Sequence, residues 1–241
     1  MKKLIIIVMS FIFFPWILNA QEKADEIVRN VDKILGPGPF VGEITMESFQ
    51  SNGKFMRYEM KIYHKTKDSV LVEVLSPEIE KGRKILRIKN KVWMYMPSVK
   101  RTIQVSQKDE VLGSDFSNYD LTNLSLIDDY NSVIDSTSNT NYYLHLKAVS
   151  RSINYDMIKS TVRKKDNMPL TNEFYTSTNK KLKTLNFSDV KNYGRGILRP
   201  SVLTMINSLV QNKKTIVKYN TFKYNVPIND ALFNRNTFAD F

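Results

Sequence analysis

The sequence predicts a mainly β protein of the α+β class, with one N-terminal helix, about ten or eleven antiparallel strands and a helical insertion in the middle of the chain. Three observations favour this class. Apolar residues have helical spacing near the N-terminus, they alternate with polar residues through most of the rest, and the alternation stops between residues 113 and 130. The 241 residues contain no linker and no convincing repeat, so we expect one domain after the N-terminal signal.

The first twenty residues, MKKLIIIVMSFIFFPWILNA, are typical of a cleaved secretory signal. Lys2 and Lys3 precede an apolar run, and Ala20 stands at a suitable cleavage position. The run is short for a membrane span of roughly 20 apolar residues, so an uncleaved anchor is the less favoured alternative. The predicted domains are a signal peptide over residues 1–20 and a soluble, exported domain over residues 21–241.

Charge and composition exclude several classes of function. Removing Lys2 and Lys3 from the 36 basic residues leaves 34 against 24 acidic residues, a net charge of +10. A basic surface suits nucleic acid, anionic lipid or an acidic partner, and export argues against nucleic acid. The absence of cysteine excludes thiol catalysis, a cysteine-ligated metal site and lipidation of the chain at cysteine.

The segment EKADEIVRNVDKILGPGP, residues 22–39, is expected to form an amphipathic helix that ends at Gly36-Pro37. Its charged residues take one face, and that face is expected to be solvated. The opposite face is an apolar stripe that must pack on something, made of Ala24, Ile27, Val28, Val31, Ile34 and Leu35.

The period of the apolar residues then changes to two, which predicts short antiparallel strands separated by turns. The first group of strands is expected around 57–62, 71–75, 85–89, 92–97 and 102–105. One or two short helices follow within 113–130. Further strands are expected near 129–135, 140–150, 155–165, 169–177, 180–191, 201–210 and 214–225, and a short helical turn closes the chain at 229–234.

The stretch GSDFSNYDL, residues 113–121, is the strongest candidate for catalysis, because Ser114 and Asp115 could act as nucleophile and partner. A serine nucleophile needs a base, and neither histidine nor lysine occurs in this stretch. The preferred interpretation is structural: Ser114 or Asp115 caps a short helix. Phe116, Tyr119 and Leu121 then pack downward, and with Leu124 they would form a lid.

The other polar candidates also favour a protein without an active site. His64 and His145 are interpreted as solvated strand residues, and no spacing of histidines suggests a metal site. Asp128 and Asp129 are adjacent, so on a strand their side chains would point to opposite faces. The sequence therefore predicts no enzyme activity, no metal and no cofactor.

Apolar residues exceed what a single helix and a small insertion are expected to cover. They include methionines, which suit surfaces that accept ligands of varying shape, although an ordinary core is the alternative. Of the residues at 92–97, we expect Met94 and Met96 to line an apolar groove together with Leu86 and Ile88. The full set of candidate cavity residues is Met46, Tyr58, Met60, Ile62, Val72, Val74, Leu86, Ile88, Trp93, Met94, Tyr95 and Met96.

Several motifs resemble the LolA-like outer-membrane lipoprotein-sorting family. They are ADEIVRNVDKILGP, SPEIEKG, WMYMPSVKR, GSDFSNYDL and the C-terminal LKTLNFSDVKNYGRGILRPSVLTMINSLV, so the resemblance covers nearly the whole mature chain. It implies an open antiparallel β half-barrel, LolA/LolB-like, with a helical lid and an apolar interior. One departure is Gly196, where family members usually carry a large residue.

The resemblance implies a monomeric periplasmic carrier that binds acyl chains of lipoproteins or lipids and passes them towards the outer membrane. Its expected partners are an inner-membrane transporter of the ABC or RND type and an outer-membrane acceptor. Two alternatives remain. The first is an accessory subunit that docks on such an exporter and carries nothing, favoured by the exposed turn at Lys100-Arg101. The second is an envelope hydrolase that uses Ser114 and Asp115.

Overall fold

The computed structural model describes residues 15–194 and 196–241, which form one long helix, thirteen strands and three short helical segments. The helices are α1 (Pro15–Leu35), α2 (Asn118–Thr122), η1 (Asp230–Phe233) and η2 (Phe238–Asp240). The strands are β1 (Phe40–Phe49), β2 (Phe55–Thr66), β3 (Ser69–Ser76), β4 (Lys84–Ile88), β5 (Lys91–Met96), β6 (Arg101–Val105), β7 (Tyr130–Thr137), β8 (Asn141–Ala148), β9 (Met157–Arg163), β10 (Pro169–Tyr175), β11 (Lys181–Asn192), β12 (Leu198–Asn207) and β13 (Lys214–Tyr224).

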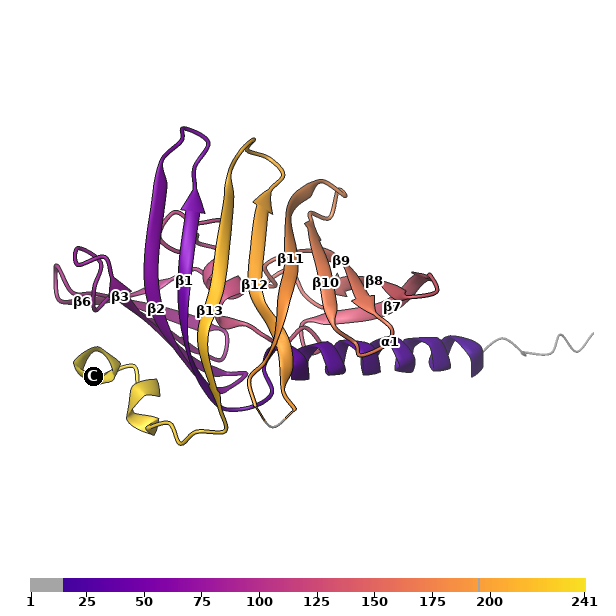
Figure 1. Ribbon diagram of the computed structural model, residues 1–241, viewed down its shortest axis with the longest axis horizontal. Helices are drawn as coiled ribbons and strands as arrows, with labels where there is room; N and C mark the ends of the chain where they lie inside the picture. Colours follow the sequence, from indigo (N-terminus) through magenta and orange to yellow (C-terminus); the bar gives the residue numbers. More distant parts are fainter. Residues whose placement is uncertain (1–14, 195) are drawn as a thin grey trace, which may run out of the picture.

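All thirteen strands form one antiparallel sheet in the order β6-β5-β4-β3-β2-β1-β13-β12-β11-β10-β9-β8-β7. Strand β1 pairs with β13, so segments from the two ends of the chain meet in the middle of the sheet (Figure 1). The predicted mainly β class and the open half-barrel are confirmed. The strand number is higher than the expected ten or eleven. Strand β1 lacked a clear alternating pattern, because its buried face includes Gly42 and Ser48.

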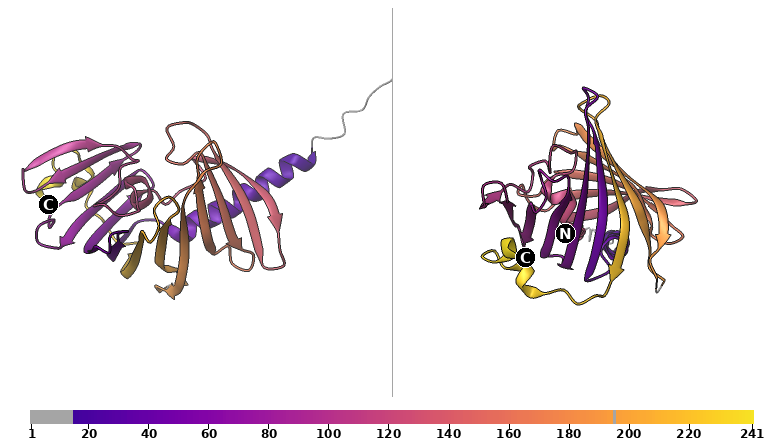
Figure 2. Two further views of the ribbon diagram at one scale, coloured as in Figure 1. Left: turned by 90° about the horizontal axis from the view of Figure 1, so that it is seen from above. Right: turned by 60° about the vertical axis from the view of Figure 1, so that its left-hand side comes forward.

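Helix α1 packs its predicted apolar stripe against the sheet. Ala24, Ile27, Val28, Val31 and Leu35 are buried, while Ile34 is half-buried. The helix contacts β7 and β12 and lies along this half of the sheet (Figure 2). The described helix begins at Pro15, upstream of the expected residue 22. The predicted signal peptide over 1–20 lies mostly outside the described residues. None of the helices in residues 15–194 and 196–241 combines the length and the hydropathy of a membrane-spanning segment.

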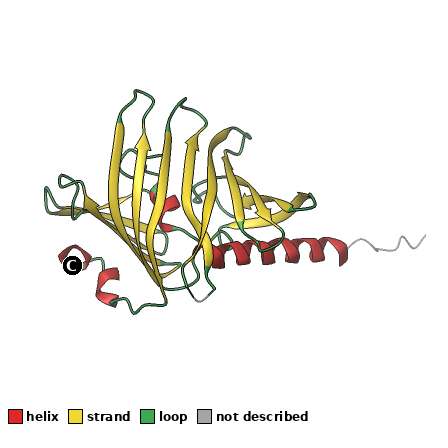
Figure 3. Cartoon of the chain, in the orientation of Figure 1, coloured by secondary structure: helices red, strands yellow, loops and turns green. Residues whose placement is uncertain are grey.

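The segment between β6 and β7 crosses the concave face of the sheet and carries the predicted helical insertion. Helix α2 has only five residues, and Figure 3 shows it against the central strands. Its capping residue is Ser117, whose side chain accepts a hydrogen bond from the N–H of Asp120 while the Asp120 carboxylate accepts one from the N–H of Ser117. This reciprocal pair satisfies two backbone donors at the start of the helix.

The C-terminal segment, residues 226–241, covers part of the opposite, convex face. Phe238 is fully buried against Leu71, Leu86 and Trp93. The ammonium group of Lys84 donates hydrogen bonds to the backbone oxygens of Ala239 and Phe241 in this segment. Strands β3 to β5 therefore bury apolar side chains on both faces.

Candidate functional site

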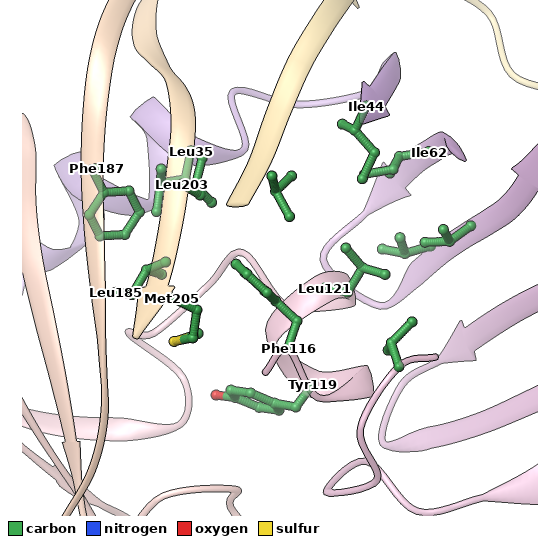
Figure 4. Close-up of a cluster of buried hydrophobic side chains, with 14 of the residues drawn as sticks. Leu35, Ile44, Ile62, Phe116, Tyr119, Leu121, Leu185, Phe187, Leu203 and Met205 are labelled. Carbon is green, nitrogen blue, oxygen red and sulfur yellow. The ribbon is translucent and has the colours of Figure 1, made fainter. Parts of the chain in front are cut away.

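The candidate site is the apolar interior between the concave face of the sheet and the segment that crosses it. Figure 4 shows α2 at its centre, with Ile44 and Ile62 on one side and Leu185, Leu203 and Met205 on the other. We call residues 111–124 the lid, because this segment closes the interior with its own side chains. Phe116, Tyr119 and Leu121 are buried there, and Leu124 packs at the margin.

Half of the predicted cavity residues lie in this interior together with the lid. These residues are buried members of the same apolar cluster: Met46, Tyr58, Met60, Ile62, Val72 and Val74. Met94 is half-buried at its edge, and Met96 is half-buried at the end of β5. Alternation along β2 and β3 was sufficient to identify the inward-facing residues of those strands.

The other predicted cavity residues face away from the interior. Leu86, Ile88, Trp93 and Tyr95 belong to the convex-face cluster beneath the C-terminal segment. In the register of β4 and β5, Met94 lies opposite Ile85, whereas Trp93 lies opposite Leu86. The expectation that Met94 and Met96 share a face with Leu86 and Ile88 is therefore wrong. Both faces of these strands are apolar because both are covered, so alternation could not distinguish them.

Neither Ser114 nor Asp115 caps a helix, contrary to the sequence-based interpretation. The cap is Ser117, three residues beyond Ser114. The Ser114 hydroxyl accepts a hydrogen bond from the N–H of Phe116 at 3.2 Å and donates one to the Phe116 carbonyl oxygen at 3.3 Å. Both Ser114 and Asp115 are almost completely buried. Their partners come from this loop and from distant strands, which the local sequence could not reveal.

Asp115 tethers the start of the lid to β12 and β13. Its backbone N–H donates to the hydroxyl of Thr215 at 3.0 Å, and its carboxylate accepts hydrogen bonds from Thr215 at 3.0 Å and from the Asn207 amide at 2.9 Å. The ammonium group of Lys213 lies 3.5 Å from the same carboxylate. Three polar side chains thus converge on this buried residue.

Asp120 forms a second tether, between α2 and the wall. Its carboxylate accepts hydrogen bonds from Lys183 on β11 and from the Tyr155 hydroxyl, each at 2.8 Å. Lys183 also donates to the carbonyl oxygen of Asp115 at 2.7 Å. Burial, reinforced by the nearby Asp120, raises the pKa of Tyr155 well above its usual value, so Tyr155 stays protonated and donates to the carboxylate.

Two further charged residues hold the end of the lid and the residues that follow it. Arg87 on β4 donates to the carbonyl oxygen of Thr122 at 3.3 Å, and burial lowers the pKa of its guanidinium. Asp32 on α1 accepts hydrogen bonds from the N–H groups of Leu126 at 2.9 Å and Ile127 at 3.1 Å. Burial raises the pKa of Asp32 to about 6 even though these hydrogen bonds lower it.

Two other sequence-based placements need correction. Asp128 and Asp129 lie in the turn before β7 rather than on a strand, and they bind different partners. Asp128 pairs with Lys67 at 2.6 Å, whereas Asp129 accepts a hydrogen bond from the Tyr119 hydroxyl at 2.7 Å. Among residues 15–194 and 196–241, no group of three His, Asp or Glu side chains is arranged to hold a metal ion.

His64 is buried rather than solvated. Its ring stacks on Phe40 at a centroid distance of 4.9 Å, and its Nδ1 lies 3.2 Å from the carbonyl oxygen of Gly38. Burial lowers the pKa of His64 to about 4, so the ring is neutral near pH 7. His145 is half-buried, on the side of β8 opposite the buried Leu144 and Leu146.

Gly196, the departure from the family pattern, lies in the exposed turn between β11 and β12. Its φ of +75° favours glycine, and an added Cβ would meet no atom of the described chain within 4 Å. The position therefore makes no contribution to packing in the interior.

Comparison with known proteins supports the fold. The model of a family described as uncharacterized protein matches residues 66–240. A LolA superfamily protein from Nitrosomonas europaea has a TM-score of 0.79 at 23% identity, over 88% of this chain and 98% of that one. A putative outer membrane lipoprotein-sorting protein domain from Vibrio parahaemolyticus has a TM-score of 0.78 at 22% identity, over 91% and 99% of the two chains.

A DUF1329 family protein from Desulfovibrio piger is similar to the same extent. Its TM-score is 0.80 at 20% identity, and the match covers 90% of this chain and 98% of that one. The search of curated proteins finds no match. The resemblance to LolA-like proteins is thus confirmed, and at these identities it establishes a shared fold.

Proposed function

This chain belongs to that family of uncharacterized proteins and has the LolA-superfamily fold, and from this premise we propose that it is a periplasmic carrier. It binds the acyl chains of lipoproteins or lipids in its apolar interior and passes them towards the outer membrane. The proposal includes no catalytic step. An inner-membrane transporter of the ABC or RND type supplies the cargo, and an outer-membrane acceptor receives it from a monomeric carrier.

The observation that carries the proposal is the chemistry of the lid. Its apolar residues Phe116, Tyr119 and Leu121 occupy the interior, while Asp115 and Asp120 hold it through hydrogen bonds and ion pairs. A five-residue helix has little stability of its own, so it depends on these contacts. A segment held in this way can leave the interior when another apolar group takes its place.

The free energy gained by burying an acyl chain is similar in size to the free energy lost when the lid leaves the interior. A sheltered acyl chain gains about 0.8 kcal/mol per CH₂, on the order of 12 kcal/mol for sixteen carbons. Burial of Phe116, Tyr119 and Leu121 contributes about 1.5–3 kcal/mol each, to which the polar tethers add. Because the two sides nearly balance, cargo can enter and also be released, as a carrier requires.

Truncation of a lid side chain tests the proposal. Phe116→Ala should lower the free energy of unfolding by about 3–5 kcal/mol, because it leaves a cavity. It should also raise the affinity for a fluorescent fatty acid, since a less stable closed lid competes less with the probe. Phe187→Ala is the matched control: Phe187 is buried on β11 in the same cluster, but it belongs to the wall.

If cargo displaces the lid, the two variants should differ in their affinity for the probe. Phe187→Ala should lose stability without a gain in affinity, whereas Phe116→Ala should lose stability and bind the probe more tightly. Equal affinities in the wild type and in Phe116→Ala, or no binding of the probe to any form, would contradict the carrier proposal. If the probe binds as expected, mass spectrometry of organic extracts from gently purified protein would identify the natural cargo.

The second candidate is an accessory subunit that docks on an exporter and carries nothing. It is favoured by the free edge of the sheet at β6, where Val99 and Ile103 are 55% and 43% exposed beside Lys100 and Arg101. Val99→Ser combined with Ile103→Ser should abolish co-purification of a transporter under this reading. The carrier proposal instead predicts that the double variant still binds the fatty-acid probe.

A further inference from the structure

Arg199 on β12 is a fully buried cation inside a box of aromatic rings. Its guanidinium carbon lies 4.0 Å from the centroid of the Tyr219 ring, 4.2 Å from that of Phe222 and 5.8 Å from that of Phe40. Its relative exposure is 0%. Arg199 occupies the same inward-facing row of β12 as Leu203 and Met205, so it lies at one end of the apolar interior.

None of the three guanidinium nitrogens of Arg199 has a hydrogen-bond partner among the described residues. A guanidinium carries five N–H donors and keeps its charge at any pH a protein tolerates. The faces of the aromatic rings offset part of the cost of burying that charge. They leave the five donors unpaired, however, and an unpaired buried charge strongly destabilises a fold.

The other buried basic side chains among residues 15–194 and 196–241 have oxygen partners. Lys84 donates to backbone oxygens of the C-terminal segment, Arg87 donates to backbone oxygens of Lys67 and Thr122, and Lys183 pairs with Asp120. Lys213, which is also largely buried, lies against Glu110 and Asp115. In the described part of the chain, a buried guanidinium with no partner at any of its three nitrogens therefore occurs at Arg199 alone, whereas at Arg83 and Arg87 only the Nε atom is buried without a partner.

We propose that Arg199 binds the anionic head group, a carboxylate or a phosphate, of an amphiphile whose chain enters the interior. This inference rests on the carrier function proposed above, and it adds the chemical class of the cargo. The planar fork of arginine matches two oxygens of a carboxylate or phosphate. Leu203 and Met205 continue the row with apolar side chains, which suit the attached chain.

A pair of probes that differ only in head-group charge tests this inference. Parinaric acid carries a carboxylate, and its methyl ester has the same fluorescent chain without the charge. In fluorescence titrations at pH 7.5, the wild-type protein should bind the acid at least ten-fold more tightly than the ester. Arg199→Met should bind both probes equally, with an affinity for the ester within about two-fold of the wild type.

Two controls separate the effect of Arg199 from those of net charge and folding. Lys218→Met removes one positive charge from the exposed face of β13, where Lys218 pairs with Glu47 at 2.8 Å, and it should keep the preference for the acid. Arg199→Lys keeps a charge without the fork and should give an intermediate preference. The melting temperature of each variant shows whether it is folded.

The outcomes are distinct. Equal binding of acid and ester by the wild-type protein overturns the inference even if no variant at Arg199 folds, and so does a preference that survives in folded Arg199→Met. Binding of neither probe overturns the carrier function and this inference together. A last outcome is that the wild type shows no preference for the acid, while inorganic phosphate raises the melting temperature of the wild type but not that of Arg199→Met. This result would assign the site to a free anion and overturn the proposal of a lipid head group.

Discussion

Lys183 on β11 donates a hydrogen bond to the carboxylate of Asp120 on α2 at 2.8 Å, and this contact joins the wall of the half-barrel to its lid. The two side chains are only 13% and 5% exposed. The ring of Tyr155 lies 5.1 Å below the same ammonium group, and its hydroxyl donates to the same carboxylate. The pair is therefore the centre of a buried network that holds the lid closed.

Asp120→Ala should destabilise the protein strongly. The variant leaves Lys183 buried without its carboxylate and removes the acceptor of Tyr155, and breaking a buried pair in this way costs about 3–5 kcal/mol. Urea denaturation gives the free energy of unfolding. Hydrogen exchange should show the largest loss of protection in residues 114–123.

Glu173→Ala is the matched control for this prediction. Its carboxylate pairs with Lys181, another lysine of β11, but both side chains are about one-third exposed. Such a pair contributes roughly 0–1 kcal/mol, so the control should remain close to the wild type. If Asp120→Ala proves as stable as Glu173→Ala, then the Asp120 network does not hold the lid.

His64 should make the protein sensitive to acid. Burial lowers its folded-state pKa from 6.5 to about 4, so the stability contributed by neutral His64 is present above pH 6.5. That stability is lost as the pH falls from 6.5 to 4, because the unfolded chain takes up the proton first. The shift corresponds to about 3 kcal/mol in the free energy of unfolding.

His64→Gln removes this titration while keeping a side-chain donor near Gly38. The stability difference between wild type and variant should be constant from pH 7 to 8 and should shrink by about 3 kcal/mol between pH 6.5 and 4. Denaturation curves at half-unit pH steps measure it. A difference that does not change across this range would mean that His64 is not buried as a neutral ring.

Phe238→Ala should detach the C-terminal segment from the convex face. Phe238 is fully buried against Trp93, and truncating a buried phenylalanine costs about 3–5 kcal/mol. The emission of Trp93 should move to longer wavelength as its ring becomes solvated. The second tryptophan, Trp16, falls within the predicted signal peptide and leaves Trp93 as the reporter of the mature domain.

Phe241→Ala is the control in the same segment. Phe241 is 51% exposed, and its backbone oxygen still accepts from Lys84 after truncation. The expected change is within about 0.5 kcal/mol, with no shift in Trp93 emission. An unshifted spectrum in Phe238→Ala would contradict the packing of this segment on Trp93.

Much of the fold was accessible from local patterns. The helical spacing of Ala24 through Leu35 identified the buried stripe of α1, and the alternation around Tyr58, Met60 and Ile62 identified the inward face of β2. The break in alternation marked the lid. These predictions succeeded because each depends on one element with one buried face.

The sequence-based predictions failed where the burial of a residue depends on a second element that packs against it. The convex face of β4 and β5 is buried only because the C-terminal segment returns to it, so Leu86 and Trp93 resembled cavity residues. His64 is buried because Phe40 stacks on it from the neighbouring strand. Nothing in the sequence next to these residues indicates those partners.

By itself, the periodicity of the sequence determined a mainly β antiparallel protein with an N-terminal helix and a central helical insertion, because side-chain periodicity fixes which face of each element seeks burial. Only the tertiary structure decided what the polar residues do. Asp115 meets Thr215, one hundred positions along the chain, and Asp120 meets Lys183 on β11. Arg199 meets aromatic rings and no oxygen among the described residues. Such pairings depend on how strands join in space, and local spacing carries no information about them.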